Sequence, residues 1–267
     1  NNTIYGIPLG SNYQCLFYDK TLIEKAGIGP IPDNMTWEVF AAYTTALSRA
    51  LGNGTYGTSD ASGNYDAFEI WIRQRGKELY TKEGALNFEQ LDVVDWYQYW
   101  SNLRTNNGCP PIDVQAKLDL SGTPTDSSVI KGKAVFCHLF SNQLQAYQAA
   151  TSHPLALVEY PKGSTPGVYL KVSMLLSIAA ATKYPDVAAN FASFVVTDPG
   201  AVKALGIERG VPGSAASLSA LKPLLTPTQQ HIVDFMNLAA ANGNTRVKEV
   251  LDPPGAGQIA NILQRVA

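Results

Sequence analysis

The side chains best suited to chemistry in this sequence are aromatic, amide and charged residues, most of them in segments expected to be loops. Aromatic faces pack against the C–H faces of sugars, while amides, carboxylates and guanidinium groups match arrays of hydroxyls. The set consists of Asn12, Tyr13, Gln14, Tyr65, Asp66, Trp71, Ser141, Asn142, Gln143, Tyr169, Lys171 and Arg209. This inventory indicates recognition of a carbohydrate or a similar polar solute.

Residues that could catalyse a reaction do not form a known pattern. The three histidines lie far apart, and none accompanies a nucleophile in a GxSxG context. His138 lies inside an apolar run and is expected to be a hydrogen-bonded core residue. A carbohydrate-active enzyme is the rival interpretation, but it needs two carboxylates flanking a cleft, and only Asp66, Glu69 and Glu159 come near the polar set. We therefore expect no catalytic residue.

Metal and cofactor motifs are also missing. Cys15, Cys109 and Cys137 form no CxxC pair and have no histidine at metal spacing, so neither zinc nor a redox site is expected. Two alternatives stay open: a Cys109–Cys137 disulfide with one free thiol, or three plain buried cysteines. Gly255-Ala256-Gly257-Gln258-Ile259-Ala260 has the letters of a dinucleotide fingerprint, but no strand precedes it, so we expect only a helix N-terminus there.

The charge balance excludes two further classes of partner. The formal net charge is -2 and charges are spread without blocks, which removes the electrostatic footprint of nucleic-acid binding. The longest apolar stretch, residues 174–181, is far shorter than the roughly 20 residues that span a bilayer. We therefore expect no nucleic-acid partner and no membrane-spanning segment.

Short apolar runs alternate with amphipathic segments, and this alternation predicts an α/β fold. Strands are expected at residues 4–9, 15–18, 55–58, 134–140, 155–160 and 175–180, with a polar crossing at 10–14. Helices are expected at residues 21–26, 67–74, 87–104, 127–131, 141–150 and 186–196. Another helix should begin after Thr36, which is a good N-cap, and end at Gly52.

A series of short motifs follows in order along the chain. They are Ile4-Tyr5-Gly6-Ile7-Pro8, Leu16-Phe17-Tyr18-Asp19-Lys20, Lys25-Ala26-Gly27, Thr36-Trp37-Glu38, Gly132-Lys133-Ala134-Val135-Phe136 and Thr197-Asp198-Pro199-Gly200. In order and spacing the series resembles the extracellular solute-binding proteins, family 1, of ABC-type sugar importers. The resemblance covers essentially the whole chain and implies a periplasmic-binding-protein-like (type II) α/β fold, in which the solute binds between two lobes.

The resemblance also implies a division into lobes. Residues 1–11 would be a hinge-approach strand, 12–170 the C-terminal lobe, 171–205 a crossover segment belonging to the N-terminal lobe, and 206–267 the return to the C-terminal lobe. In the family, the part that builds most of the N-terminal lobe precedes the first of these motifs. The chain is therefore expected to be a fragment lacking most of that lobe.

A crossover segment without its lobe would expose an apolar face. Its apolar residues are Leu175, Leu176, Ile178, Phe191, Phe194 and Val195. Large apolar patches are rarely left bare in soluble proteins. We therefore expect the chain to self-associate through this face.

The resemblance assigns binding roles residue by residue. The matching positions are Asn12, Tyr13, Gln14, Tyr65, Asp66, Ser141, Asn142, Tyr169, Lys171, Ser173 and Arg209. Asn142 stands where the family most often has tryptophan, and Val172-Ser173 replaces a pair of glycines, so a more polar cleft is expected. Lys171 and Arg209 could then recognise an acidic or phosphorylated sugar. The alternative is that Lys171 is a solvated strand end and Arg209 forms a hinge salt bridge.

The resemblance thus implies the substrate-binding component of an ABC importer, located outside the cell, in the periplasm or on the cell surface. Its partners would be a sugar or sugar derivative and the importer's permease, with no cofactor and no catalysis. An isolated lobe that binds nothing on its own is the remaining alternative.

Overall fold

The main sheet has four strands in the order β3-β4-β2-β5. In the computed structural model, which describes residues 4–119, 121–243, 248 and 250–267, these strands are β2 Gln14–Asp19, β3 Tyr56–Thr58, β4 Ala134–Phe140 and β5 Leu155–Val158. β2 runs antiparallel to β4 and to β5, whereas β3 runs parallel to β4. The carboxyl ends of β3, β4 and β5 therefore share one edge of the sheet with the amino end of β2.

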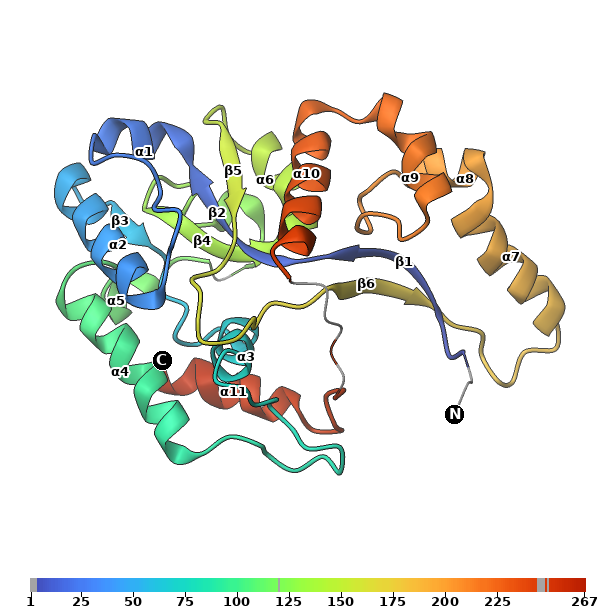
Figure 1. Cartoon of the computed structure of the whole chain (residues 1–267), viewed down its shortest axis with the longest axis horizontal. Helices are drawn as coiled ribbons and strands as arrows, with labels where there is room; N and C mark the ends of the chain where they lie inside the picture. The colour runs from blue at the N-terminus through green and yellow to red at the C-terminus, as the bar shows by residue number, and fades with distance from the viewer. Residues whose placement is uncertain (1–3, 120, 244–247, 249) are drawn as a thin grey trace.

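Helices surround this sheet to form the main body (Figure 1). They are α1 Lys20–Ala26, α2 Trp37–Leu51, α3 Tyr65–Arg73, α4 Gln90–Thr105, α5 Ile112–Gln115, α6 Leu144–Ala149, α10 Pro227–Ala241 and α11 Gly257–Val266, with single 3₁₀ turns η1 Pro124–Asp126 and η2 Ser141–Gln143. α2 packs against β3, α6 and α10 pack against β5, and α3 packs against α4 and α11.

Local signals set several helix ends as the sequence predicts. The Thr36 hydroxyl accepts a hydrogen bond from the Val39 N–H and so caps α2. α1 ends at Gly27, whose φ of 65° lies in the left-handed region that glycine adopts without strain. α11 begins at Gly257, so the glycine pattern near the C-terminus is a helix N-terminus and not a nucleotide loop.

Four tryptophans form the centre of the packing between α2, α3 and α4. The Trp37 ring meets the Trp71 ring edge to face, with centroids 5.2 Å apart, and Trp96 lies 5.4 Å from Trp71 and 5.5 Å from Trp100. All four side chains are buried. This aromatic cluster holds α3, and with it the polar residues at the start of α3, in a fixed position against the sheet.

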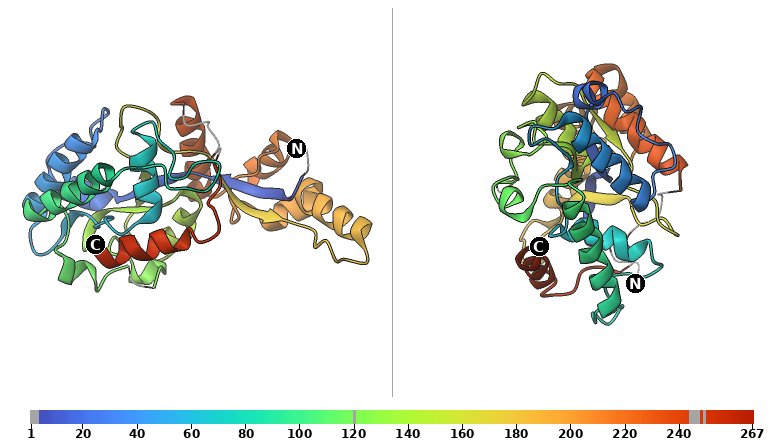
Figure 2. Two further views of the ribbon diagram at one scale, coloured as in Figure 1. Left: turned by 90° about the horizontal axis from the view of Figure 1, so that it is seen from below. Right: turned by 90° about the vertical axis from the view of Figure 1, so that its left-hand side faces the viewer.

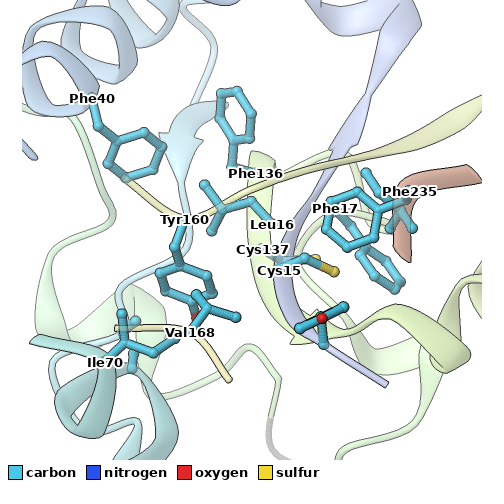
Figure 3. Packing of buried hydrophobic residues seen from close by; sticks show 14 of the residues in the cluster. Cys15, Leu16, Phe17, Phe40, Ile70, Phe136, Cys137, Tyr160, Val168 and Phe235 are labelled. Atoms are coloured by element: carbon cyan, nitrogen blue, oxygen red, sulfur yellow. The ribbon is translucent and has the colours of Figure 1, made fainter. Parts of the chain in front are cut away.

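A second part of the core covers the two faces of the sheet (Figure 3). Side chains from β2 and β4 meet Phe40 of α2 and Phe235 of α10 there. Cys15, Cys109 and Cys137 are all free and buried, so no Cys109–Cys137 disulfide forms and the alternative of three buried cysteines is confirmed. Burial raises the pKa of each thiol, as expected for structural rather than reactive cysteines.

A two-stranded ribbon leads from the main body to a group of helices at the far end of the molecule (Figures 1 and 2). We call this part the arm. It consists of β1 Ile7–Asn12, β6 Lys171–Leu176, α7 Pro185–Thr197, α8 Pro199–Leu205 and α9 Ala215–Leu221. β1 and β6 pair antiparallel, and α8 packs against both α7 and α9. After the turn η3 Lys222–Leu224, the chain returns to the main body with α10.

The division into lobes stays a prediction. Ser217 of α9 donates a hydrogen bond to the Val196 carbonyl of α7 at 3.1 Å, so the chain stays with the arm beyond residue 206. The ribbon begins at Ile7, and residues 1–3 of the predicted hinge-approach strand lie outside the described residues.

Three predictions of secondary structure are wrong. The polar crossing at 10–14 is strand, because Ser11 and Asn12 pair with β6 and Gln14 pairs with β4, leaving only Tyr13 between β1 and β2. Residues 127–131 form a turn and not a helix. The last strand begins earlier than predicted, at Lys171, because its polar half pairs with the polar half of β1. In the first and third cases, strand pairing between residues far apart in the chain overrides the local pattern.

The arm carries an exposed apolar surface. Leu175, Ile178, Phe191 and Phe194 are 43–61% exposed, whereas Leu176 and Val195 are half-buried. Because such a surface is costly in water, we expect the chain to self-associate and its mass in multi-angle light scattering to rise with concentration. The variant Phe191→Ser with Phe194→Ser should remain monomeric. A constant monomeric mass for the unmodified chain at all concentrations would contradict this expectation.

Candidate ligand-binding site

The polar residues singled out in the sequence gather at one edge of the main sheet. Residues that follow β3, β4 and β5, and the residues that precede β2, meet there because β2 runs opposite to its two neighbours. In α/β folds, ligands commonly bind outside the carboxyl ends of the strands. The topology therefore places the candidate site at this edge.

Asn12 and Asn142 form the first pair at this edge. The Asn12 side chain donates from Nδ2 to Oδ1 of Asn142 at 2.9 Å. Beneath them, the Tyr13 N–H donates to the Ser141 hydroxyl at 3.1 Å, and the Ser141 N–H donates to the Tyr13 carbonyl at 2.8 Å. These bonds join the start of β2 to the end of β4 and hold the two asparagines in place.

Tyr13, Gln14 and Ser141 serve as this support rather than as a free surface. The Tyr13 ring is only 2% exposed and belongs to the core. The Gln14 amide lies 3.4 Å from the Tyr160 hydroxyl, and the reverse orientation of the same amide would bond to the first turn of α3. The Ser141 side chain is fully buried. A solute would therefore not contact these three side chains directly.

Lys171 lies next to Asn12 in the β1–β6 register. Its Nζ is 3.2 Å from Oδ1 of Asp66, at the start of α3, and 4.3 Å above the Phe140 ring. The Lys171 and Asp66 side chains are 39% and 30% exposed, so this ion pair is worth less than about 1 kcal/mol and can exchange for a ligand contact. The contact with the Phe140 ring keeps the ammonium over the site.

Two glycines bring Arg209 to the same place. A Cβ on Gly10 would lie 2.5 Å from the Gly210 carbonyl oxygen, so only glycine at residue 10 permits this approach of the two backbones. Ser11 and Val211 exchange backbone hydrogen bonds of 2.9 and 2.8 Å beside it. The Ser173 hydroxyl donates to the Gly10 carbonyl at 3.0 Å and to the Arg209 carbonyl. The predicted hinge salt bridge of Arg209 is absent among the described residues.

These residues surround a hollow of about 290 Å³, which we call the Lys171 hollow. Its lining includes five of the predicted site residues: Asn12, Asn142, Lys171, Ser173 and Arg209. It also includes Phe140, Gln143, Met174 and Glu208. Gln143 belonged to the polar inventory, whereas Phe140 and Met174 look like ordinary strand residues, and nothing in the sequence marks Glu208.

Tyr65 and Tyr169 lie instead in a neighbouring ion cluster. The Lys248 ammonium is 2.6 Å from Oε1 of Glu69 and 2.6 Å from Oδ1 of Asp252. The Tyr169 hydroxyl donates to Glu69 at 3.2 Å, and the Tyr65 hydroxyl donates to Asp252 at 3.1 Å. Sequence reasoning missed Lys248 and Asp252, which lie far along the chain from α3.

The carboxylates at the site are arranged for structure rather than for acid–base work. Glu69 is 1% exposed, and burial raises its pKa while the Lys248 charge opposes that rise. Asp66 is paired with Lys171. His138 is a core residue, as predicted, 3.0 Å from the Tyr160 hydroxyl, and burial lowers its pKa to about 3. Together these contacts favour a binding site over a hydrolytic one.

The fold and the site define an α/β, periplasmic-binding-protein-like (type II) lobe with a crossover arm. Residues 1–225 match the family described as bacterial extracellular solute-binding protein. The chain belongs to this family, which confirms the resemblance found in the sequence. No helix among the described residues is both long and apolar enough to cross a membrane.

Solved structures agree with this assignment. The chain is similar to an extracellular solute-binding protein family 1 member from Alicyclobacillus acidocaldarius, with 27% identity and a TM-score of 0.81 over 100% of this chain and 67% of that one. It also resembles a periplasmic oligogalacturonide-binding protein from Yersinia enterocolitica in complex with saturated digalacturonic acid, with 20% identity and a TM-score of 0.83 over 99% and 67%. A third match, with 17% identity and a TM-score of 0.71 over 98% and 67%, is an ABC transporter solute-binding protein from Thermotoga lettingae bound with α-D-tagatose.

Proposed function

We propose that this chain captures a sugar or sugar derivative at the Lys171 hollow, as the substrate-binding component of an ABC importer. The main support is that one hollow is lined by five residues that the family resemblance assigned to ligand binding. They come from β1, β6, the end of β4 and the loop before Val211. Amides, a hydroxyl and two cations match the hydroxyl and acidic groups of a saccharide.

The charges in the hollow favour an acidic saccharide. Arg209 makes no ion pair with another described residue, and its guanidinium group can form a bidentate pair with a carboxylate. Lys171 adds a second positive charge to the same lining, whose one negative charge among the described residues is that of Glu208. The relative from Yersinia enterocolitica is a protein bound to digalacturonic acid, which supports the same class of solute here.

Delivery to the importer's permease, outside the cell in the periplasm or at the cell surface, is the second part of the proposal. It rests on the family alone. Closure of a second lobe over the hollow would remove water and strengthen each hydrogen bond to the solute.

A thermal-shift screen tests the proposal. Monosaccharides, disaccharides, sugar phosphates and uronic acids are added to the chain, and the midpoint of unfolding is measured. A solute at a hundred times its Kd stabilises the folded state by about 2.7 kcal/mol, which shifts the midpoint by about 5 °C or more. The absence of a shift with every saccharide, also in the chain joined to a complete second lobe, would contradict the proposed function.

Arg209→Gln tests the role of the guanidinium group. We expect the Kd for digalacturonic acid to rise about tenfold or more, because a charge-assisted pair is lost, while the Kd for neutral maltose stays unchanged. Apo stability should change by less than about 0.5 kcal/mol, because the side chain is exposed. Arg265→Gln, at an exposed position on α11, is the matched control. An equal rise in Kd for both saccharides would show that Arg209 does not recognise the acidic group.

A further inference from the structure

A second hollow lies at the same edge of the main sheet, in front of β3 and β4. It measures about 250 Å³ and is lined by the segment after β3, the end of β4 and the loop that contains Ser127. We call it the Ser127 hollow. Gln143 lines both this hollow and the Lys171 hollow. The two hollows are therefore neighbours across the carboxyl end of β4.

Each hollow contains a buried side-chain oxygen with no hydrogen-bond partner among the described residues. In the Lys171 hollow it is Oδ1 of Asn12, a residue 6% exposed, and in the Ser127 hollow it is the hydroxyl of Ser127, which is 2% exposed. An unpaired buried polar group costs about 1–3 kcal/mol. A solute that bonds to both atoms would remove this cost at both ends of the edge.

Side-chain N–H donors that bond to no described residue line the Ser127 hollow and its boundary with the Lys171 hollow. The Asn64 Oδ1 accepts from the Ala67 N–H at 3.0 Å and caps α3, which leaves the Nδ2 group without a bond to a described residue. The Gln143 Oε1 accepts from the Phe140 N–H at 2.9 Å, and the Nε2 group of Gln143 likewise makes no bond to a described residue. Two fixed amides thus present N–H donors to whatever occupies this space.

The acceptors of the Ser127 hollow are held by a separate network. Asp119 accepts from the Ser128 N–H at 2.8 Å and from the side-chain Nε2 of Gln115 at 3.1 Å, and Oε1 of Gln115 accepts from the Asp60 N–H at 3.0 Å. Asp60 is ion-paired with Arg104, whereas Asp119 has no cationic partner among the described residues. This net negative charge disfavours a carboxylate or phosphate there.

We infer that the Ser127 hollow is a second saccharide subsite, so that the solute is an oligosaccharide with an acidic ring at the Lys171 hollow and a neutral ring at the Ser127 hollow. This inference rests on the proposed function. Both donors and acceptors line the second hollow, and the hydroxyls of a neutral sugar use both. Gln143 lies where the linkage between the two rings would pass.

The test compares two probes, glucuronic acid and the aldobiouronic acid in which glucuronic acid is linked to xylose. We expect the disaccharide to bind at least tenfold more tightly than glucuronic acid in isothermal titration. Ser127→Ala should weaken the disaccharide about three- to tenfold, the usual worth of one neutral hydrogen bond, and leave glucuronic acid unchanged.

Ser128→Ala is the matched control. Ser128 is also a fully buried serine whose hydroxyl has no partner, but it does not line the Ser127 hollow. Neither substitution should lower the apo midpoint of unfolding, because each removes an unsatisfied hydroxyl. The control should therefore bind both probes like the unmodified chain.

Three results would overturn the inference while leaving the proposed function intact. They are equal Kd values for the two probes, equal effects of Ser127→Ala and Ser128→Ala, and tighter binding of digalacturonic acid than of the aldobiouronic acid. Stabilisation by Ca²⁺ that Ser127→Ala abolishes would assign the hollow to a cation instead. If no saccharide of any kind binds, the proposed function fails and the inference fails with it.

Discussion

Lys248→Met is expected to lower the free energy of unfolding by about 3 kcal/mol at pH 8. The substitution leaves the Glu69 carboxylate buried without its cation, and breaking one side of a buried ion pair typically costs 3–5 kcal/mol. Urea unfolding at pH 8 measures the change. Lys133→Met, at an exposed lysine near the opposite end of β4, should change stability by less than about 0.5 kcal/mol.

The loss of unfolding free energy caused by Lys248→Met should become smaller as the pH falls. Burial raises the pKa of Glu69, and without the opposing charge of Lys248 that pKa rises further. In the unfolded chain the pKa of Glu69 is about 4.3. At a pH between this value and the raised pKa of the folded variant, Glu69 is protonated when the variant is folded and ionised when it is unfolded. Stability of the variant therefore falls as pH rises through this window.

The pH comparison also supplies the control for this prediction. The deficit at pH 5 should be smaller than at pH 8, and adding Glu69→Gln should recover most of it at pH 8. A deficit that is the same at both pH values would show that the loss of Lys248 acts through packing and not through the charge of Glu69.

Trp96→Ala is expected to destabilise the main body by about 4 kcal/mol. Trp96 is fully buried, and its ring lies 5.4 Å from the Trp71 ring and 5.7 Å from the Phe68 ring. Its Nε1 also donates to the Ser62 carbonyl at 2.8 Å, two residues before the N-cap of α3. The substitution therefore creates a cavity and frees the segment that carries Asn64 and Asp66.

Urea unfolding followed by circular dichroism measures this loss. Leu91→Ala is the control, because Leu91 is 64% exposed on the same helix, α4, and its truncation should cost less than about 0.5 kcal/mol. A loss below about 1.5 kcal/mol for Trp96→Ala would mean that the tryptophan cluster is not what holds α3 in place.

Several features of the fold could be predicted from short stretches of sequence. The Thr36 cap, the Gly27 terminus and the apolar face of α2 depend on residues within a few positions of one another. The 134–140 strand and the two helices that follow Asn64 and Glu89 were likewise predicted, with ends shifted by up to three residues. Local hydrogen bonding and periodicity determine such elements, so local sequence is sufficient.

The candidate site was predictable in kind but not in detail. Asn12, Asn142, Lys171, Ser173 and Arg209 were chosen from motif positions, and the structure brings them to one hollow. The same reasoning could not tell that the Tyr13 ring points into the core, because side-chain direction depends on strand pairing.

By itself, the sequence determined the α/β class, the family and the polar, partly cationic character of the site, because composition and ordered motifs are properties of the chain. Only the tertiary structure decided that β1 continues through Asn12, that Lys248 neutralises Glu69, and that Gln143 joins two hollows. These facts depend on contacts between residues far apart in the chain. Burial and charge pairing then set which polar atoms are satisfied and which remain free for a solute.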